Sequence, residues 1–224
     1  MRNRGILALC VAGCLLVAAC GGDAPPIKVG SAPAIGSKVT LPRPASNGLT
    51  SFGDWPQACG LITDVDVHAI LPQSHGIVRR SFNPAFKLRG DYGMTTRTAV
   101  GAGCQMTWWL PGSNPDAKVP TVNLDLSFDA VGSPSIVQEN YTTSKTGIVG
   151  VPGLDRCVQS PESYRCLTHG DGWTQAAFTL QWTGDPSVSR FEGQPGGTGR
   201  DATDAFWHDR VAVEFVKVVA ARLP

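Results

Sequence analysis

The first twenty residues constrain the fold most, because they decide where the chain is delivered and how many cysteines remain to pair. Residues 1–4 are basic, and residues 5–19 form an apolar run without a charged side chain. A run of about fifteen residues is too short to cross a bilayer, but it suits the apolar segment of an export signal. The later apolar runs are shorter still, so the sequence predicts a signal over residues 1–19 and no transmembrane span.

The end of this run resembles the lipobox of bacterial lipoproteins. Small residues lead up to Cys20 in the stretch Val17-Ala-Ala-Cys-Gly21. The resemblance implies cleavage just before Cys20, attachment of a diacylglycerol to its sulfur, and anchoring at the extracytoplasmic face of the cell membrane. Two or three acyl chains such as palmitate give stable anchoring, whereas one chain is marginal. The alternative is an ordinary secretory signal followed by a chance cysteine.

Four cysteines are left once Cys10 and Cys14 leave with the signal and Cys20 carries lipid. They are Cys59, Cys104, Cys157 and Cys166. An even number in an exported domain predicts a disulfide framework, for which three connectivities exist. Proximity favours Cys157–Cys166, and Cys59–Cys104 then follows as the longer staple. The spacings do not fit paired metal ligands and no cysteine is left over, so we predict no metal, no cofactor and no catalytic thiol.

Composition narrows the partner classes and the domain layout. The net charge is +1 and only 17% of residues are charged, so nothing favours a nucleic-acid partner. An apolar content of 42% is enough for a core. Residues 20–53 are rich in Pro, Gly and Ser with almost no aliphatic periodicity, which predicts a flexible, lipid-anchored tether. Residues 54–224 are then expected to form one extracytoplasmic domain.

Three segments carry helical signals. Thr63 can cap a short helix that reaches Leu71 and stops at Pro72. Ser133-Pro134 can start a second helix that runs to about Lys145. Asp201 can cap a long final helix over residues 202–222, which carries an apolar stripe.

Strand signals lie between these helices. Residues 121–128 alternate cleanly, and residues 95–109 and 173–182 also show a period of two, with residues 148–151 as a short extra strand. Residues 73–95 carry no clear pattern and are expected to be mostly loop. The tally predicts an α+β fold, an antiparallel β-sheet with two or three helices packed on one face and stapled by disulfides.

The order of the parts resembles a known family. A cysteine before a capped helix (Cys59 to Leu71), the strand Cys104-Gln-Met-Thr-Trp108, the turn Val151-Pro-Gly-Leu154 and an apolar final helix follow one another. Over roughly residues 55–223 this resembles the actinobacterial lipoproteins grouped as domain of unknown function 3558. The resemblance implies a cell-envelope lipoprotein with a Cys59–Cys104 bridge. It carries over no catalytic residue and does not imply the Cys157–Cys166 pair.

Four residues are candidates for a binding surface. Trp108 and Trp109 are adjacent, so in a strand their rings point to opposite faces, and one of them can line an exposed apolar or glycan-stacking surface. The alternative is that helices cover both. His169 and Asp171 lie in a His-Gly-Asp turn that could perform acid–base chemistry, although ordinary polar turn residues have the same pattern. Nucleophile and zinc-protease motifs are absent from the sequence.

These features predict a membrane-anchored module of the cell envelope rather than an enzyme. We expect it to be held to the membrane at Cys20 and to bind an envelope protein, glycan or lipid. One alternative is an envelope hydrolase that uses His169 and Asp171. Another is a binding protein for a small lipid or glycan.

Overall fold

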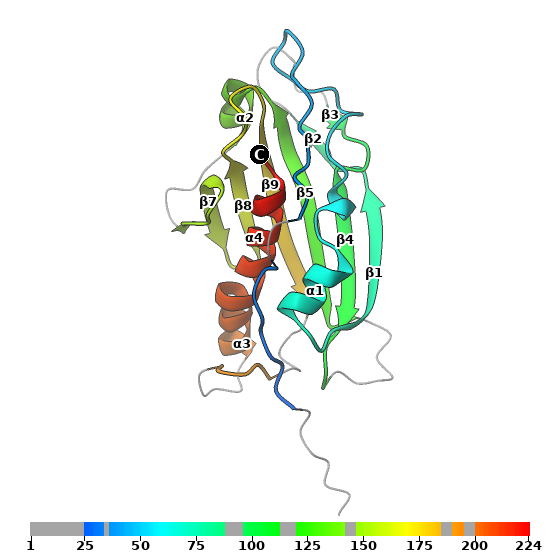
Figure 1. The fold of residues 1–224 in the computed structure, drawn as a ribbon, viewed down its shortest axis with the longest axis vertical. Coiled ribbons are helices and arrows are strands. Elements are labelled where there is room, and N and C mark those ends of the chain that lie inside the picture. Colours follow the sequence, from blue (N-terminus) through cyan, green and yellow to red (C-terminus); the bar gives the residue numbers. More distant parts are fainter. Residues whose placement is uncertain are drawn as a thin grey trace, which may run out of the picture.

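The computed structural model of the chain describes residues 25–33, 36–87, 96–112, 120–141, 147–184, 190–194 and 200–224. The predicted signal over residues 1–19 and the predicted lipidation at Cys20 lie outside the described residues. The described chain is an α+β fold, as predicted (Figure 1).

A seven-stranded antiparallel sheet forms the centre of the molecule, in the order β1-β4-β5-β9-β8-β7-β6. The strands are β1 (His75–Phe82), β4 (Gly103–Trp109), β5 (Val122–Gly132), β6 (Ile148–Val149), β7 (Leu154–Ser160), β8 (Ser163–Thr168) and β9 (Gln175–Gly184). A separate two-stranded sheet pairs β2 (Ala85–Lys87) with β3 (Thr96–Thr98). Two parts of the main sheet were not expected, namely the edge strand β1 and the β7–β8 hairpin.

Alternation sorts the central strands into two faces as the sequence predicts. The inner face carries the buried side chains of three neighbouring strands: Cys104, Met106 and Trp108 of β4, Val122, Leu124, Leu126 and Phe128 of β5, and Ala176, Phe178, Leu180 and Trp182 of β9. The intervening residues of the same strands are mostly polar and point to the outer face.

Two helical segments cover the inner face (Figure 1). Helix α1 (Asp64–Ile70) begins at Thr63, which forms the predicted capping interaction as a full capping box with Asp66. The C-terminal segment is helical from Arg200, one residue before the expected cap, to Arg222. It comprises α3 (Arg200–Phe206), a π-helical stretch (Trp207–Ala212) and α4 (Val213–Arg222). The phenyl ring of Phe215 packs on Trp108, with 5.7 Å between ring centroids.

The second predicted helix is shorter than expected and lies on the other face. Helix α2 (Pro134–Asn140) has Pro134 in its first turn and ends at Tyr141, whose backbone is no longer helical. The rest of the expected range, residues 142–145, lies outside the described residues. Val137 and Tyr141 pack with Ala130, Leu167 and Ala177, which alternate with inner-face residues. The prediction of helices on a single face is therefore wrong for α2, because a small apolar patch at one end of the outer face gives it a docking surface.

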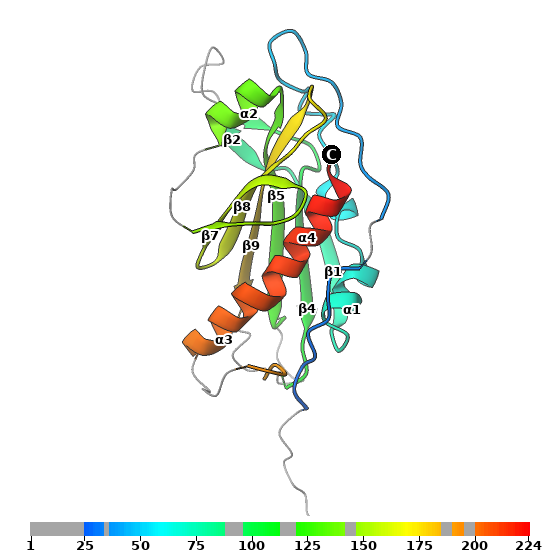
Figure 2. The ribbon, with the colours of Figure 1, turned by 60° about the vertical axis from the view of Figure 1, so that its left-hand side comes forward.

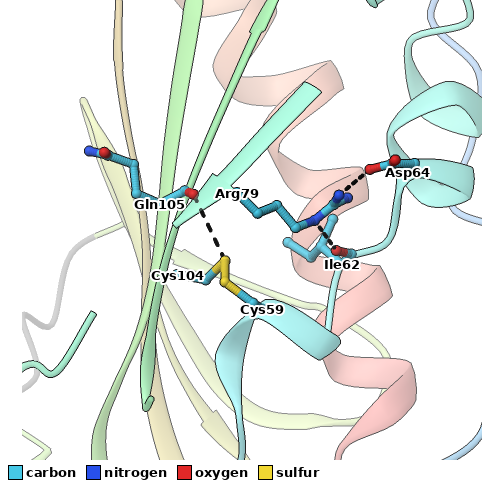
Figure 3. Close-up of a disulfide and its surroundings, with 6 residues drawn as sticks. All are labelled: Cys59, Ile62, Asp64, Arg79, Cys104 and Gln105. Carbon is cyan, nitrogen blue, oxygen red and sulfur yellow. Dashed lines mark hydrogen bonds and ion pairs between the residues drawn. A yellow bond between two sulfur atoms is a disulfide. The ribbon is translucent and has the colours of Figure 1, made fainter. Parts of the chain in front are cut away.

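Both predicted disulfides are present. Cys59–Cys104 joins the 3₁₀ turn Ala58–Gly60 to strand β4, and Cys157–Cys166 joins directly paired residues of β7 and β8. Figure 3 shows the first bridge and the nearby Arg79, which donates to the carbonyl oxygen of Ile62 at 3.1 Å and forms an ion pair with Asp64. The bridge and Arg79 together hold the start of α1 against the β1–β4 edge.

The segment predicted as a tether packs on the domain instead. We call its described residues, 25–33 and 36–53, the strap. Three of its aliphatic side chains are buried against the domain, namely Ile27, Leu41 and Leu49. Its backbone N–H groups donate to other elements, from Gly30 to the carbonyl oxygen of Ile70 at 2.8 Å and from Val39 to that of Arg222 at 2.7 Å.

The expectation of a flexible tether over residues 20–53 is therefore wrong for the strap, and the folded unit begins well before residue 54. Three isolated aliphatic side chains provide buried apolar area without producing a helical or strand period. The ends of α1, α4 and β5 supply partners for the backbone groups of the strap, as buried backbone requires.

Candidate functional site

The two ends of the sheet are built differently. At one end, beyond the last residue of β9, Ile27 of the strap pairs with Phe191 in a short parallel bridge. At the other end, the turn His169–Thr174 precedes β9 and lies beside the strap loop Pro44–Gly48. We call these the Ile27 end and the turn end. Strand β9 has ten residues and separates them by roughly 30 Å. In Figures 1 and 2 the Ile27 end is at the bottom and the turn end at the top.

The turn His169–Thr174 is held by its own hydrogen bonds. The carboxylate of Asp171 accepts from the backbone N–H of Trp173 at 2.9 Å and from that of Thr174 at 2.7 Å. The bond from Thr174 has the largest effect on Asp171 and lowers its pKa. Gly170 and Gly172 have φ of 78° and 85°, a backbone conformation that favours glycine. The N–H of Gly170 also donates to the carbonyl oxygen of Pro224 at 3.0 Å, which ties the turn to the segment after α4.

This fixed turn presents Trp173 to solvent. Trp173 is 64% exposed, whereas Trp55, Trp108, Trp182 and Trp207 are buried. The guanidinium of Arg43 from the strap lies over the indole ring, 5.1 Å from its centroid. Trp173 also borders a shallow hollow of about 440 Å³, whose other walls are the strap loop Pro44–Gly48 and the start of α2.

A second, more apolar groove lies on the other side of the turn. It has a volume of about 660 Å³ and runs between the strap, the end of α4 and the turn. Pro33, Pro152, Ala220 and Leu223 form much of its wall. His169, Asp171, Lys38 and Lys217 provide its polar groups, and Lys217 is paired with Glu214 at 2.6 Å.

The structure brings together two of the four predicted surface residues. His169 and Asp171 both line the apolar groove. They do not form a pair, because Nδ1 of His169 lies 2.6 Å from Oδ1 of Asp155 and Asp171 is occupied by the turn amides. His169 keeps 79% of its side chain exposed. Any acid–base chemistry of this histidine would therefore involve Asp155, which the sequence did not suggest.

The two adjacent tryptophans, Trp108 and Trp109, line neither hollow at the turn end. Trp108 is fully buried on the inner face beneath Phe215, so its predicted place on a binding surface is wrong. Trp109 points to the outer face and is half-buried. Its ring covers Gly76 of β1 so closely that a Cβ on that glycine would overlap it. Trp109 therefore serves the packing of a sheet edge.

Trp173 is the residue that the sequence reasoning missed. We expected it to be the first residue of the strand that contains Trp182, but β9 begins at Gln175. A signal was present, because Trp173 follows the Gly-Asp-Gly sequence typical of a tight turn. A large aromatic residue directly after a turn sits outside the alternation that would bury it.

Comparisons with family models, with curated proteins and with solved structures gave no match. The resemblance to the actinobacterial lipoproteins therefore stays a prediction. Within the described ranges, no three His, Cys, Asp or Glu side chains gather as a metal site would require. None of the helices in that part of the chain has the length and apolar character needed to span a membrane.

Proposed function

We propose that this protein is a lipid-anchored module of a bacterial cell envelope, and that it binds an envelope component at its turn end. The observation that carries the binding role is Trp173, a large aromatic side chain held in solvent by a hydrogen-bonded turn between two hollows. Binding sites are typically concave and largely formed before the ligand arrives. The turn end meets both conditions.

The position of the strap supports an anchor at Cys20. Cys20 is seven residues before Ile27, and a fully extended chain covers at most about 25 Å over that length. Because Ile27 is packed on the domain, a lipid on Cys20 would hold the Ile27 end close to the membrane. The turn end would then point away from the bilayer, towards the rest of the envelope.

The contacts of His169 and Asp171 favour binding over hydrolysis. The alternative function, an envelope hydrolase, needs a general base whose partner orients it towards a substrate. The carboxylate of Asp171 is occupied by two backbone amides of its own turn. His169 has Asp155 as its partner, but the side chain of His169 is largely open to water and Asp155 also accepts from Gln175. Loss of an envelope-hydrolysing activity in His169→Gln, with envelope binding retained, would favour the hydrolase over the module.

The anchor is tested in cells that make the full-length protein. We expect the wild-type chain in the membrane fraction, with a mass increase from acyl chains on its N-terminal peptide at Cys20. Cys20→Ala should lack that mass increase. An unmodified Cys20 in the wild-type protein would contradict the anchoring part of the proposal.

The binding role is tested with the full-length protein purified in detergent. It is mixed with cell-envelope fragments cleared of membranes, and separately with vesicles of the extracted envelope lipids, and then sedimented. We expect Trp173→Ala to lose most of its retention on one of these two materials. Val65→Ala is the matched control, because Val65 is 71% exposed but lies on α1, away from the turn end. Equal retention of the two variants would refute the binding role of the turn end.

A further inference from the structure

The hollow beside Trp173 differs from the apolar groove in the chemistry of its walls. Hydroxyl groups come from Ser46, Ser133 and Ser135, and none of its lining residues is charged. The Oγ atoms of Ser133 and Ser135 lie 3.1 Å apart. Although Ser133 precedes helix α2, its side chain makes no capping hydrogen bond to the helix. The Ser133 hydroxyl is therefore paired with the Ser135 hydroxyl in the first turn of α2 and does not cap a backbone N–H.

The indole ring supplies the apolar part of the same site. Arg43 lies over the ring of Trp173, yet the residue as a whole remains 64% exposed, so part of the side chain is open to a ligand. The turn that carries Trp173 is fixed by the two bonds to Asp171. Little conformational entropy is then lost when a ligand stacks on the ring, which lowers the cost of binding.

We propose that the hollow formed by Trp173, the strap loop Pro44–Gly48 and the Ser133–Ser135 hydroxyls binds a neutral hexopyranose unit of an envelope glycan. A pyranose ring has an apolar face of C–H groups that matches an indole ring, and a rim of hydroxyl groups that exchange hydrogen bonds with serines. The shallow, open shape suits one unit of a chain whose neighbours continue into solvent.

Other ligand classes fit these walls less well. An acidic sugar, a phosphate or an acidic peptide needs cationic side chains in the wall. None of the lining residues is charged, and Arg43, the cation that borders the site, is engaged over the Trp173 ring. A lipid surface needs a larger apolar patch than one indole ring. The turn end also lies opposite the Ile27 end, from which the anchored chain would reach the bilayer. A membrane contact by Trp173 is therefore an outcome that the test must distinguish.

This inference rests on the proposed function, because it identifies the class of component bound at the turn end. The two can fail separately. If the protein is retained on envelope material through Trp173 but does not bind saccharides, the proposed function stands and the saccharide inference is wrong.

The test uses full-length protein in detergent and three neutral probes, hexasaccharides of glucose, mannose and galactose. The indole N–H signals of the tryptophans are followed by NMR during each titration. We expect saturable binding of at least one probe with a dissociation constant near or below ~1 mM, and a shift of the signal that is missing in Trp173→Ala. Trp173→Ala should weaken binding at least about tenfold, which corresponds to roughly 1.4 kcal/mol.

Three further variants sharpen the assignment. Trp173→Tyr keeps an aromatic face and should restore part of the lost affinity. Ser135→Ala removes one exposed hydroxyl and should weaken binding several-fold, whereas Val65→Ala should bind like the wild-type protein. All sites are at the surface, so the variants are expected to unfold at the wild-type denaturant concentration.

Two results would overturn the inference. One is equal affinity of Trp173→Ala and the wild-type protein. The other is the absence of saturable binding to all three hexasaccharides; if the protein then associates with phosphatidylglycerol–phosphatidylcholine vesicles through Trp173, the ring is assigned to a membrane contact.

Discussion

The two faces of the central sheet are stabilised in different ways. On the inner face, apolar side chains of β4, β5 and β9 are sealed by α1, α4 and the strap. On the outer face, polar side chains form rows across the same strands. Gln105, Asp125 and Gln181 form one row, and the amide of Asn123 donates to Oγ1 of Thr183 at 3.0 Å in the next.

Trp108 and Trp109 show what this difference means for a single residue type. They are neighbours in β4, yet one is fully buried under Phe215 and the other is half-buried against Gly76. The face on which a side chain lies therefore decides its role more than its hydrophobicity does. The predictions below test whether the inner face carries most of the stability.

The largest effect is expected for Trp108→Ala. Removing this ring leaves a cavity beneath α4, and a buried Trp→Ala change costs about 3–5 kcal/mol. Trp109→Ala is the matched variant and should cost only about 1–2 kcal/mol, because its ring is half-buried. Denaturant unfolding of the full-length protein measures both. Equal costs for the two variants would contradict the assignment of the faces.

The two disulfides should differ in the same direction. Cys59–Cys104 closes a loop of 45 residues and holds the start of α1, which covers the inner face. Cys157–Cys166 closes a loop of 9 residues near a sheet edge. The loop-entropy relation gives about 4 and about 2.5 kcal/mol, respectively. Double Cys→Ala variants of each bridge, compared by denaturant unfolding, check this order. A larger loss for Cys157–Cys166 would show that the hairpin edge limits stability.

An ion pair on the inner side is the next test. Asp66 of α1 is 1% exposed and receives two hydrogen bonds from Arg222, at 2.6 and 2.8 Å. Asp66→Asn removes the charge that Arg222 faces in a buried site and should cost about 3 kcal/mol. Asp64→Asn is the control, because Asp64 also begins α1 and pairs with an arginine, but the Asp64 side chain is exposed. Unfolding midpoints that are the same for both variants would argue against the buried pair.

The same aspartate predicts how stability changes in acid. Burial alone would raise the pKa of Asp66, but the bonds from Arg222 and Thr63 outweigh it, and the net pKa is lowered. At pH values between the pKa of Asp66 in the unfolded chain, about 4, and its lower pKa in the folded protein, the unfolded chain therefore binds more protons than the folded protein does. The contribution of Asp66 is complete above pH ~4 and is lost as the pH falls through the folded value. Asp66→Asn should flatten this part of the curve of unfolding free energy against pH.

The smallest effect is expected on the outer face and has the opposite sign. Burial raises the pKa of Asp125 more than the hydrogen bond from Gln105 lowers it, and its Oδ1 atom is buried without a hydrogen-bond partner in the described structure. The charged form is therefore unfavourable in the folded state, and Asp125→Asn should stabilise the protein at pH 7 by roughly 1 kcal/mol or less. The gain should disappear in acid, where the carboxyl group is protonated. Destabilisation at pH 7 would show that the charge is used.

The sequence predicted those parts of the fold whose side chains repeat with a period. The alternation in β5 and β9 and the apolar stripe of the last helix each place a row of side chains on one face, and the structure confirms them. Thr63 is confirmed as a cap because capping depends on a local contact with Asp66. The cysteine pairing followed from counting and proximity, and both bridges are confirmed.

The missed parts lack such a period for identifiable reasons. Strand β1 lies at a sheet edge with most of its residues exposed, so no alternation of burial marks its sequence. The strap contributes isolated residues such as Ile27 and Leu41, which are buried only because distant elements receive them. The prominence of Trp173 depends on where the strap and α2 meet the turn, which no local pattern contains.

The strap also sets the order in which the domain can be completed. Its backbone donates to Arg222, and Ala32 donates to the carboxylate of Glu214 at 2.7 Å, so the strap is closed by α4, which is made later. Contacts this distant in sequence form slowly, because the chain between them must be ordered first. During synthesis, the strap has no finished surface to dock on until α4 emerges. The strap can therefore dock fully only after α4 has formed, and removing α4 would also release the strap at Ala32 and Val39.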